Sequence, residues 1–81
     1  MTAYVLIQKR PDSQPVARTI RAVRGIVEAE DITGAYDAIA VAEAGSSRDL
    51  YDRVLPQLRE IPGVTQVLPA PLGDPGTAEA A

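Results

Sequence analysis

The residue types best suited to bind a small polar molecule gather in one short stretch near the middle of the chain. They are Thr33, Gly34, Tyr36 and Asp37. A glycine can adopt a positive φ that turns its backbone N–H toward a ligand, and a carboxylate can receive an ammonium group. The tyrosine would add an apolar wall with one hydroxyl. The stretch is therefore the leading candidate for a ligand site. It suits a plain hairpin turn equally well, with Asp37 accepting hydrogen bonds from loop amides.

Two charged groups offer weaker alternatives. The basic residues of the first third of the chain, which could contact an anion or a nucleic acid, are Lys9, Arg10, Arg18, Arg21 and Arg24. No aromatic residues alternate with them for base stacking, so a solvated helix face is the favoured interpretation. The acidic residues that could hold a hard cation are Glu28, Glu30 and Asp31. No calcium-loop spacing surrounds them, which favours ordinary surface charge.

The composition removes most catalytic chemistry. Among 81 residues there is no Cys and no His, so the sequence has no thiol nucleophile, no disulfide and no imidazole base or metal ligand. We therefore expect no enzyme activity, no cofactor and no metal. The net charge is −3, from 8 basic and 11 acidic residues. This balance argues against direct DNA binding, which needs clustered positive charge.

Length and hydropathy limit the class of protein. A chain of 81 residues allows one domain. No apolar run approaches the length of a membrane-spanning helix, and the first residues lack the basic and then apolar pattern of a signal peptide. The sequence thus predicts a cytoplasmic protein without membrane contact.

Hydrophobic patterning predicts four strands and two helices. Short apolar runs rich in β-formers predict strands at residues 3–7, 26–32, 36–43 and 64–70. The first helix is expected to begin at a cap on Asp12 or Ser13 and to end at Gly25. A tight connection at residues 33–35 would join the second and third strands into a hairpin. Two prolines at the end of the last strand place it at a sheet edge.

The second helix should begin at a cap on Ser46 or Ser47, with Asp49 in the glutamate position of a capping box. Its apolar stripe consists of Leu50, Val54, Leu58 and Ile61. Pro56 lies inside this helix and should kink its last turn, because proline lacks a backbone N–H.

The element order predicts an α+β fold. A weak internal repeat aligns Gly25 with Gly63, so each half reads as strand, helix, strand. Two such halves make a ferredoxin-like β-α-β-β-α-β sandwich, with a four-stranded antiparallel sheet and both helices on one face. This domain would span residues 1–71. Residues 72–81 have too little apolar content to fold and should form a disordered tail.

The central strands predict a partner for the other sheet face. A sheet with one face in water normally alternates apolar and polar residues. The runs at residues 3–7 and 38–42 are apolar on both sides. A two-fold dimer with sheets packed face to face would cover them, although small alanines are also tolerated in water.

Residues 3–71 resemble a known family, the effector-binding (RAM) domain of the Lrp/AsnC regulators. The phrases that carry the resemblance are residues 3–7 (AYVLI), 23–27 (VRGIV), 33–37 (TGAYD) and 61–64 (IPGV). The hairpin phrase is the most specific, with a glycine, one residue, an aromatic and then an aspartate before an apolar strand. Members often carry two threonines on the last strand, where this chain has Val67 and Pro69.

The resemblance implies a dimeric α/β barrel, often assembled into rings of dimers. An amino acid or similar effector binds such proteins where dimers meet, next to the hairpin loop, which here means Thr33, Gly34, Tyr36 and Asp37. Members usually carry an N-terminal helix-turn-helix, so this chain looks like the stand-alone form. An alternative is a ligand-free interaction subunit that joins full-length regulators through the shared dimer surface. A small enzyme on the same barrel, of the monooxygenase or cyclase kind, is the weakest alternative.

Overall fold

The computed structural model describes residues 1–72, and these residues contain one antiparallel sheet. Its strands are β1 (Thr2–Lys9), β2 (Ile26–Asp31), β3 (Ala38–Glu43) and β4 (Val64–Leu72). The strand order is β2-β3-β1-β4, and all three neighbouring pairs are antiparallel. The first and third strands are therefore central, and β4 lies at an edge as predicted.

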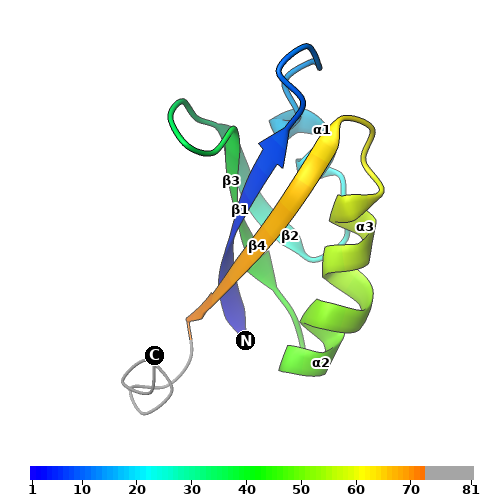
Figure 1. Ribbon diagram of the computed structural model, residues 1–81. Helices are drawn as coiled ribbons and strands as arrows, with labels where there is room; N and C mark the ends of the chain where they lie inside the picture. The colour runs from blue at the N-terminus through cyan, green and yellow to red at the C-terminus, as the bar shows by residue number, and fades with distance from the viewer. Residues whose placement is uncertain (73–81) are drawn as a thin grey trace.

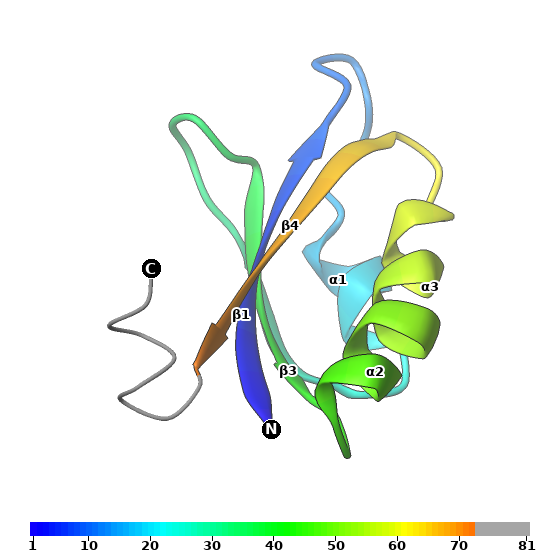
Figure 2. The same cartoon turned by 60° about the horizontal axis from the view of Figure 1, so that its bottom comes forward.

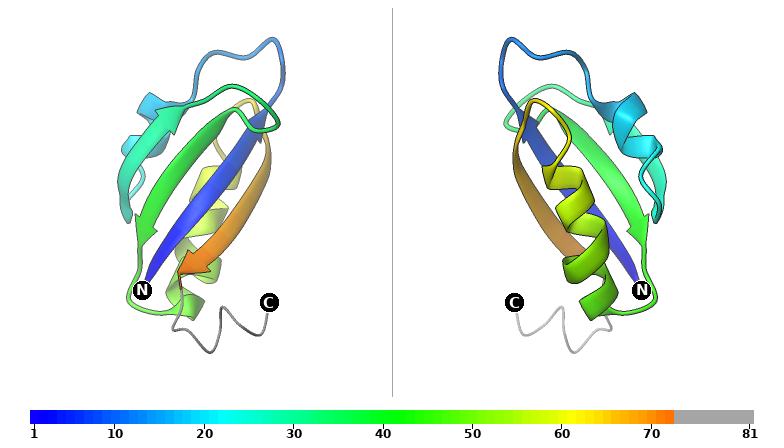
Figure 3. Two further views of the ribbon diagram at one scale, coloured as in Figure 1. Left: turned by 90° about the vertical axis from the view of Figure 1, so that its left-hand side faces the viewer. Right: turned by 90° about the vertical axis from the view of Figure 1, so that its right-hand side faces the viewer.

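The helical segments all cover the same face of this sheet (Figures 1 and 2). They are α1 (Ala17–Arg21), α2 (Ser47–Asp49), the π-helical turn η1 (Leu50–Val54) and α3 (Leu55–Arg59). The last three follow one another without a break and form one helical rod. Figure 3 shows this rod and α1 behind the sheet in one view and in front of it in the other. The arrangement confirms the predicted ferredoxin-like α+β sandwich.

The core lies between the sheet and the helices, and it is aliphatic. Alternate residues of the central strands, such as Val5 and Ala40, are buried on the helical face. All four residues of the predicted stripe on the second helix are also buried, together with Leu55, which the stripe did not include. Alanines predominate on β3, so the larger leucines and isoleucines of the helices can pack closely against it.

The first helix is shorter than predicted, and its cap comes from another element. The helix α1 begins at Ala17, and Val16 at its N-cap makes no side-chain cap hydrogen bond. The carboxylate of Asp31 on β2 instead accepts hydrogen bonds from the backbone N–H groups of Val16 and Ala17, at 3.2 and 3.1 Å. The predicted cap on Asp12 or Ser13 was wrong, because the Asp31 carboxylate on β2 accepts these hydrogen bonds instead.

The second helix begins as predicted. The Ser46 hydroxyl accepts a hydrogen bond from the backbone N–H of Asp49, at 3.0 Å. Its continuation differs from the expected kink in the last turn. The backbone N–H of Leu55 donates to Leu50 O, five residues back. The irregular turn therefore lies directly before Pro56, inside the continuous rod, where proline lacks the N–H that would continue the helical hydrogen bonds.

Two boundaries also differ from the sequence prediction. The connection between β2 and β3 spans residues 32–37, so Tyr36 and Asp37 belong to it and not to the third strand. The last strand continues to Leu72, which was expected to begin the tail. The rest of that expected tail, residues 73–81, lies outside the described residues. Within residues 1–72, no helix has the length and apolar character needed to cross a membrane.

Candidate functional site

The connection between β2 and β3 is fixed to the end of β1 by several hydrogen bonds. At its base, the backbone N–H of Ile32 donates to Asp37 O at 2.9 Å, and the N–H of Asp37 donates to Ile7 O at 2.9 Å. The Gln8 side-chain amide donates to Ala35 O at 2.8 Å. The connection projects beyond the sheet (Figure 1), and these hydrogen bonds hold its base in place.

The structure brings all four predicted site residues onto this one connection, but in two different settings. Thr33 and Gly34 are exposed at the tip, whereas Tyr36 and Asp37 are half-buried near the base. The backbone φ of Gly34 is +119°, and a Cβ atom there would meet nothing within 4 Å. Conformation alone, and not close packing, therefore favours glycine at this position.

The Asp37 carboxylate already makes a structural contact. Its Oδ2 atom accepts a hydrogen bond from the backbone N–H of Lys9 at 2.8 Å. The Oδ1 atom has no hydrogen bond to any residue of the described part of the chain. One oxygen therefore holds the connection against β1, as the plain-turn interpretation expected, and the other can still receive a donor. Sequence reasoning missed Lys9 as a partner, because a backbone N–H carries no residue-specific signal.

Lys9 also connects the hairpin to the loop that follows β1. Its ammonium group donates to Ser13 O at 3.0 Å, so it does not pair with the Asp37 carboxylate. Of the other basic residues, Arg21 donates through Nε to Ala29 O at 2.9 Å, while Arg18 and Arg24 are exposed. This arrangement is that of a solvated helix face.

The acidic residues of β2 differ in what they contact. Asp31 caps α1, and Glu28 and Glu30 are exposed on the strand. No group of three or more His, Cys, Asp or Glu side chains within residues 1–72 could hold a metal ion. The charged residues of this region therefore serve helix capping and solvation.

The sheet face opposite the helices is apolar and uncovered in the single chain. Tyr4 is 42% exposed there, and its cross-strand neighbour Val41 is half-buried. Leu6 and Ile39 form the next pair along the same face. A shallow hollow of about 200 Å³ lies beside Tyr4, with Glu28 at its edge. The unalternating pattern of the central strands thus corresponds to apolar side chains on both faces of the sheet.

Comparison with family models identifies one family. The model of the Lrp/AsnC ligand binding domain matches residues 2–68. A search of curated proteins gives no significant match. Among solved structures, TTHA0845 from Thermus thermophilus is 28% identical, with a TM-score of 0.72 over 91% of this chain and 96% of that one. The hypothetical protein PHS023 from Pyrococcus horikoshii is 24% identical, with a TM-score of 0.70 over 90% and 92%.

A longer protein contains the same fold. The transcriptional regulator NMB0573 from Neisseria meningitidis, solved as a complex with L-Met, has a TM-score of 0.73 at 18% identity. The alignment covers 91% of this chain and 51% of the regulator. This likeness concerns the fold, which the regulator carries in about half of its length.

Proposed function

The chain belongs to the family of Lrp/AsnC ligand binding domains, and from this premise we propose that it binds an amino acid or a similar small metabolite at a junction between subunits. The binding site consists of the residues of the hairpin connection, Thr33, Gly34, Tyr36 and Asp37. The protein acts as a binding and oligomerisation module and not as an enzyme.

The observation that carries this proposal is that only one oxygen of the Asp37 carboxylate accepts a hydrogen bond from residues 1–72. The bond from the Lys9 N–H occupies Oδ2 and fixes the carboxylate in place. A carboxylate that is already ordered loses little conformational freedom when an ammonium group binds its second oxygen. The neighbouring Tyr36 is half-buried and offers an apolar surface with a hydroxyl. The L-Met complex of the Neisseria regulator supports amino acids as the first ligands to test.

The junction between subunits requires an oligomer. We propose a homodimer, through the uncovered sheet face that includes Tyr4 and Val41, and assembly of such dimers into a ring. The hairpin connection projects at one end of the sheet (Figure 2), and in such a ring it would contact a neighbouring dimer. A cytoplasmic location and contact with a full-length Lrp/AsnC regulator belong to the same proposal.

A ligand-free interaction subunit is the second candidate, and the last strand favours it. Val67 is 5% exposed and packs into the core of the domain, so it offers no polar group to a ligand. Pro69 has neither a hydroxyl nor a backbone N–H. On this alternative, the same sheet face would join the chain to full-length regulators, and no effector would be needed.

Calorimetric titration of the chain with the proteinogenic amino acids tests the proposal. The informative variant is Asp37→Asn, because its amide oxygen can still accept the bond from the Lys9 N–H while the negative charge is lost. For an amino acid that binds the parent chain, we expect the variant to bind more weakly by about 1.5–3 kcal/mol, the range for a hydrogen bond to a charged group. The dimer should persist.

Asp12→Asn is the matched control, since Asp12 is an exposed aspartate on the neighbouring loop. It should leave affinity unchanged. If no amino acid binds the parent chain at millimolar concentration, the interaction-subunit alternative replaces the proposal. If binding is intact in Asp37→Asn, the ligand does not use this carboxylate.

A further inference from the structure

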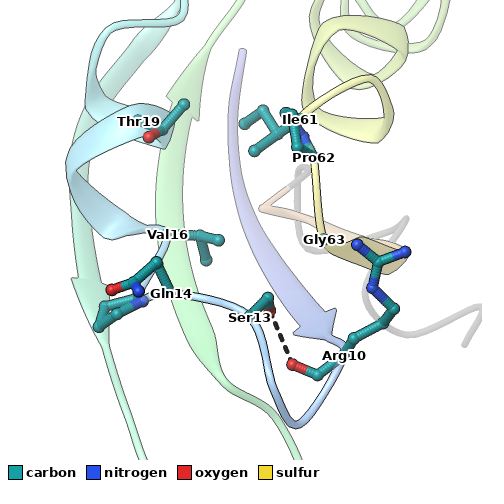
Figure 4. A pocket seen from close by; sticks show the side chains of 9 residues that line it. Arg10, Ser13, Gln14, Val16, Thr19, Ile61, Pro62 and Gly63 are labelled. Carbon is teal, nitrogen blue, oxygen red and sulfur yellow. Dashed lines mark hydrogen bonds between the residues drawn. The ribbon is translucent and has the colours of Figure 1, made fainter.

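A second concave site lies apart from the hairpin connection. A pocket of about 290 Å³ opens between the β1–α1 loop with the start of α1 on one side and the α3–β4 loop on the other (Figure 4). Its volume is near the lower limit of small-molecule pockets, about 300 Å³. The pocket therefore suits a small molecule and not a large cofactor.

One hydrogen bond joins the two walls of this pocket, and two more lie within the β1–α1 loop. The backbone N–H of Arg10 donates to Gly63 O at 2.8 Å. The Ser13 hydroxyl donates to Arg10 O at 2.7 Å, as drawn in Figure 4. The Lys9 ammonium donates to Ser13 O at 3.0 Å on the same loop. Because these bonds already fix the loops, a ligand need not order them on binding.

The lining of the pocket has one charge and an apolar floor. Of the nine lining residues, only Arg10 carries a formal charge. Its exposed side chain extends past Gly63, on the side away from Val16 and Thr19 (Figure 4), and makes no hydrogen bond or ion pair with residues 1–72. Val16 and Ile61 are buried and supply apolar surface, while Thr19 offers a hydroxyl at the opposite wall.

The surrounding charges orient an anion within the pocket. The Asp31 carboxylate lies at the start of α1, bonded to the backbone N–H groups of Val16 and Ala17, and would repel an anion there. The Lys9 ammonium and the Arg10 guanidinium lie at the β1–α1 loop, together with the exposed Asp12. An anion is therefore favoured at the Arg10 side, with its apolar part toward α1.

We propose that this pocket binds a small aliphatic monocarboxylate that lacks an amino group. On binding, the exposed Arg10 side chain turns toward the pocket, and its guanidinium donates to the carboxylate in a fork that matches it. The aliphatic part contacts Val16 and Ile61. No lining residue is acidic, so the ammonium group of an amino acid would lose its hydration without a counter-charge. This preference is the reverse of that expected at the hairpin connection.

Titration of the isotopically labelled chain, followed by backbone amide NMR signals, tests the proposal. The ligands are 4-methylpentanoate, its neutral amide and leucine, which share one aliphatic skeleton. We expect 4-methylpentanoate to shift the signals of residues 10–19 and 61–63. The amide should bind about tenfold more weakly or worse, because it lacks the negative charge. Leucine should be weakened to a similar degree, because no group in the pocket pairs with its ammonium.

The variant Arg10→Met keeps the apolar stem and the backbone bonds while it removes the guanidinium. It should weaken binding of 4-methylpentanoate about tenfold. Arg18→Met is the control, since Arg18 is an exposed arginine of α1 that does not line the pocket. Any of three results would overturn the proposal. The acid and the amide could bind equally, the two variants could have equal effects, or millimolar acid could cause no shifts. Shifts confined to residues 32–37 would do the same. Because the hairpin site is judged by Asp37→Asn with amino acids, each site can fail separately.

Discussion

Asp31 shows how a residue on one element can complete another. Its carboxylate accepts the first backbone donors of α1, a role that normally falls to a residue in the cap position itself. We expect Asp31→Ala to lower the free energy of unfolding by about 1 kcal/mol, the usual cost of losing a cap. Urea denaturation measures this change. Glu30→Ala on the same strand is the control and should have a smaller effect, since only Asp31 accepts hydrogen bonds from the start of α1. Equal losses in both variants would contradict the capping role.

Gly63 combines a left-handed conformation with a close approach. Its φ is +93°, and a Cβ atom there would lie 2.8 Å from Ser13 Cβ. We expect Gly63→Ala to destabilise the fold by about 1–3 kcal/mol, through backbone strain and this clash. Gly34→Ala has a positive φ but open space around the new atom, so its cost should be smaller. Comparison of the two urea midpoints isolates the contribution of the clash. Equal falls in the two midpoints would show that the clash contributes nothing.

At the start of the second helix, hydrogen bonds lower the pKa of the Asp49 carboxyl group. The Arg53 side chain donates to Asp49 at 2.7 and 2.9 Å, and the backbone N–H of Gly45 donates at 3.2 Å. The hydrogen bonds from Arg53 and then from Gly45 lower the pKa of Asp49 from 3.8 to about 2. The same pairing raises the pKa of Arg53. The helix therefore begins with a carboxylate that resists protonation.

This lowered pKa gives stability a defined pH dependence. The folded state holds the Asp49 proton less tightly than the unfolded state, so the carboxylate contributes its full stabilisation above the unfolded value of 3.8. That contribution is lost as the pH falls through about 2. The thermal midpoint of the parent chain should fall as the pH is lowered between these two values, and we expect it to fall less in Asp49→Asn. Asp52→Asn, which removes the more exposed Arg48–Asp52 pair, should reduce the fall by a smaller amount. Identical profiles for Asp49→Asn and the parent would refute the linkage.

At the scale of the whole molecule, we expect the uncovered sheet face to decide assembly. The exposed apolar surface around Tyr4 favours a second copy of the sheet, because burial removes it from water. Light scattering at micromolar concentration should give at least twice the 8.6 kDa mass of one chain. Tyr4→Glu places a third carboxylate beside Glu28 and Glu30 and should give a folded monomer.

Tyr51→Glu is the matched control for this variant. Tyr51 is 44% exposed, against 42% for Tyr4, but it lies on the helical layer. We expect it to leave the mass unchanged, and circular dichroism should show both variants folded. A parent chain that is monomeric at high concentration would remove the argument for the sheet-face dimer.

The sequence alone determined the element order, the aliphatic core and the class of fold. Periods of two and 3.6 residues are local properties, so the strands and the stripe on the second helix could be read directly from the chain. Four phrases taken together indicated the family. The most specific of them, at residues 33–37, lies wholly on one connection. The Ser46 cap is likewise local, since donor and acceptor are three residues apart.

Only the tertiary structure decided which groups meet across the sheet. The pairing of Asp31 with the start of α1, and of Asp37 with the Lys9 N–H, joins residues far apart in the chain. The pocket beside Arg10 likewise exists only because the α3–β4 loop folds back onto the β1–α1 loop. These contacts depend on strand order and register, which local patterns leave undetermined. The sequence thus specified the elements and the candidate residues, and their packing determined which polar groups were already bonded and which could still receive a ligand.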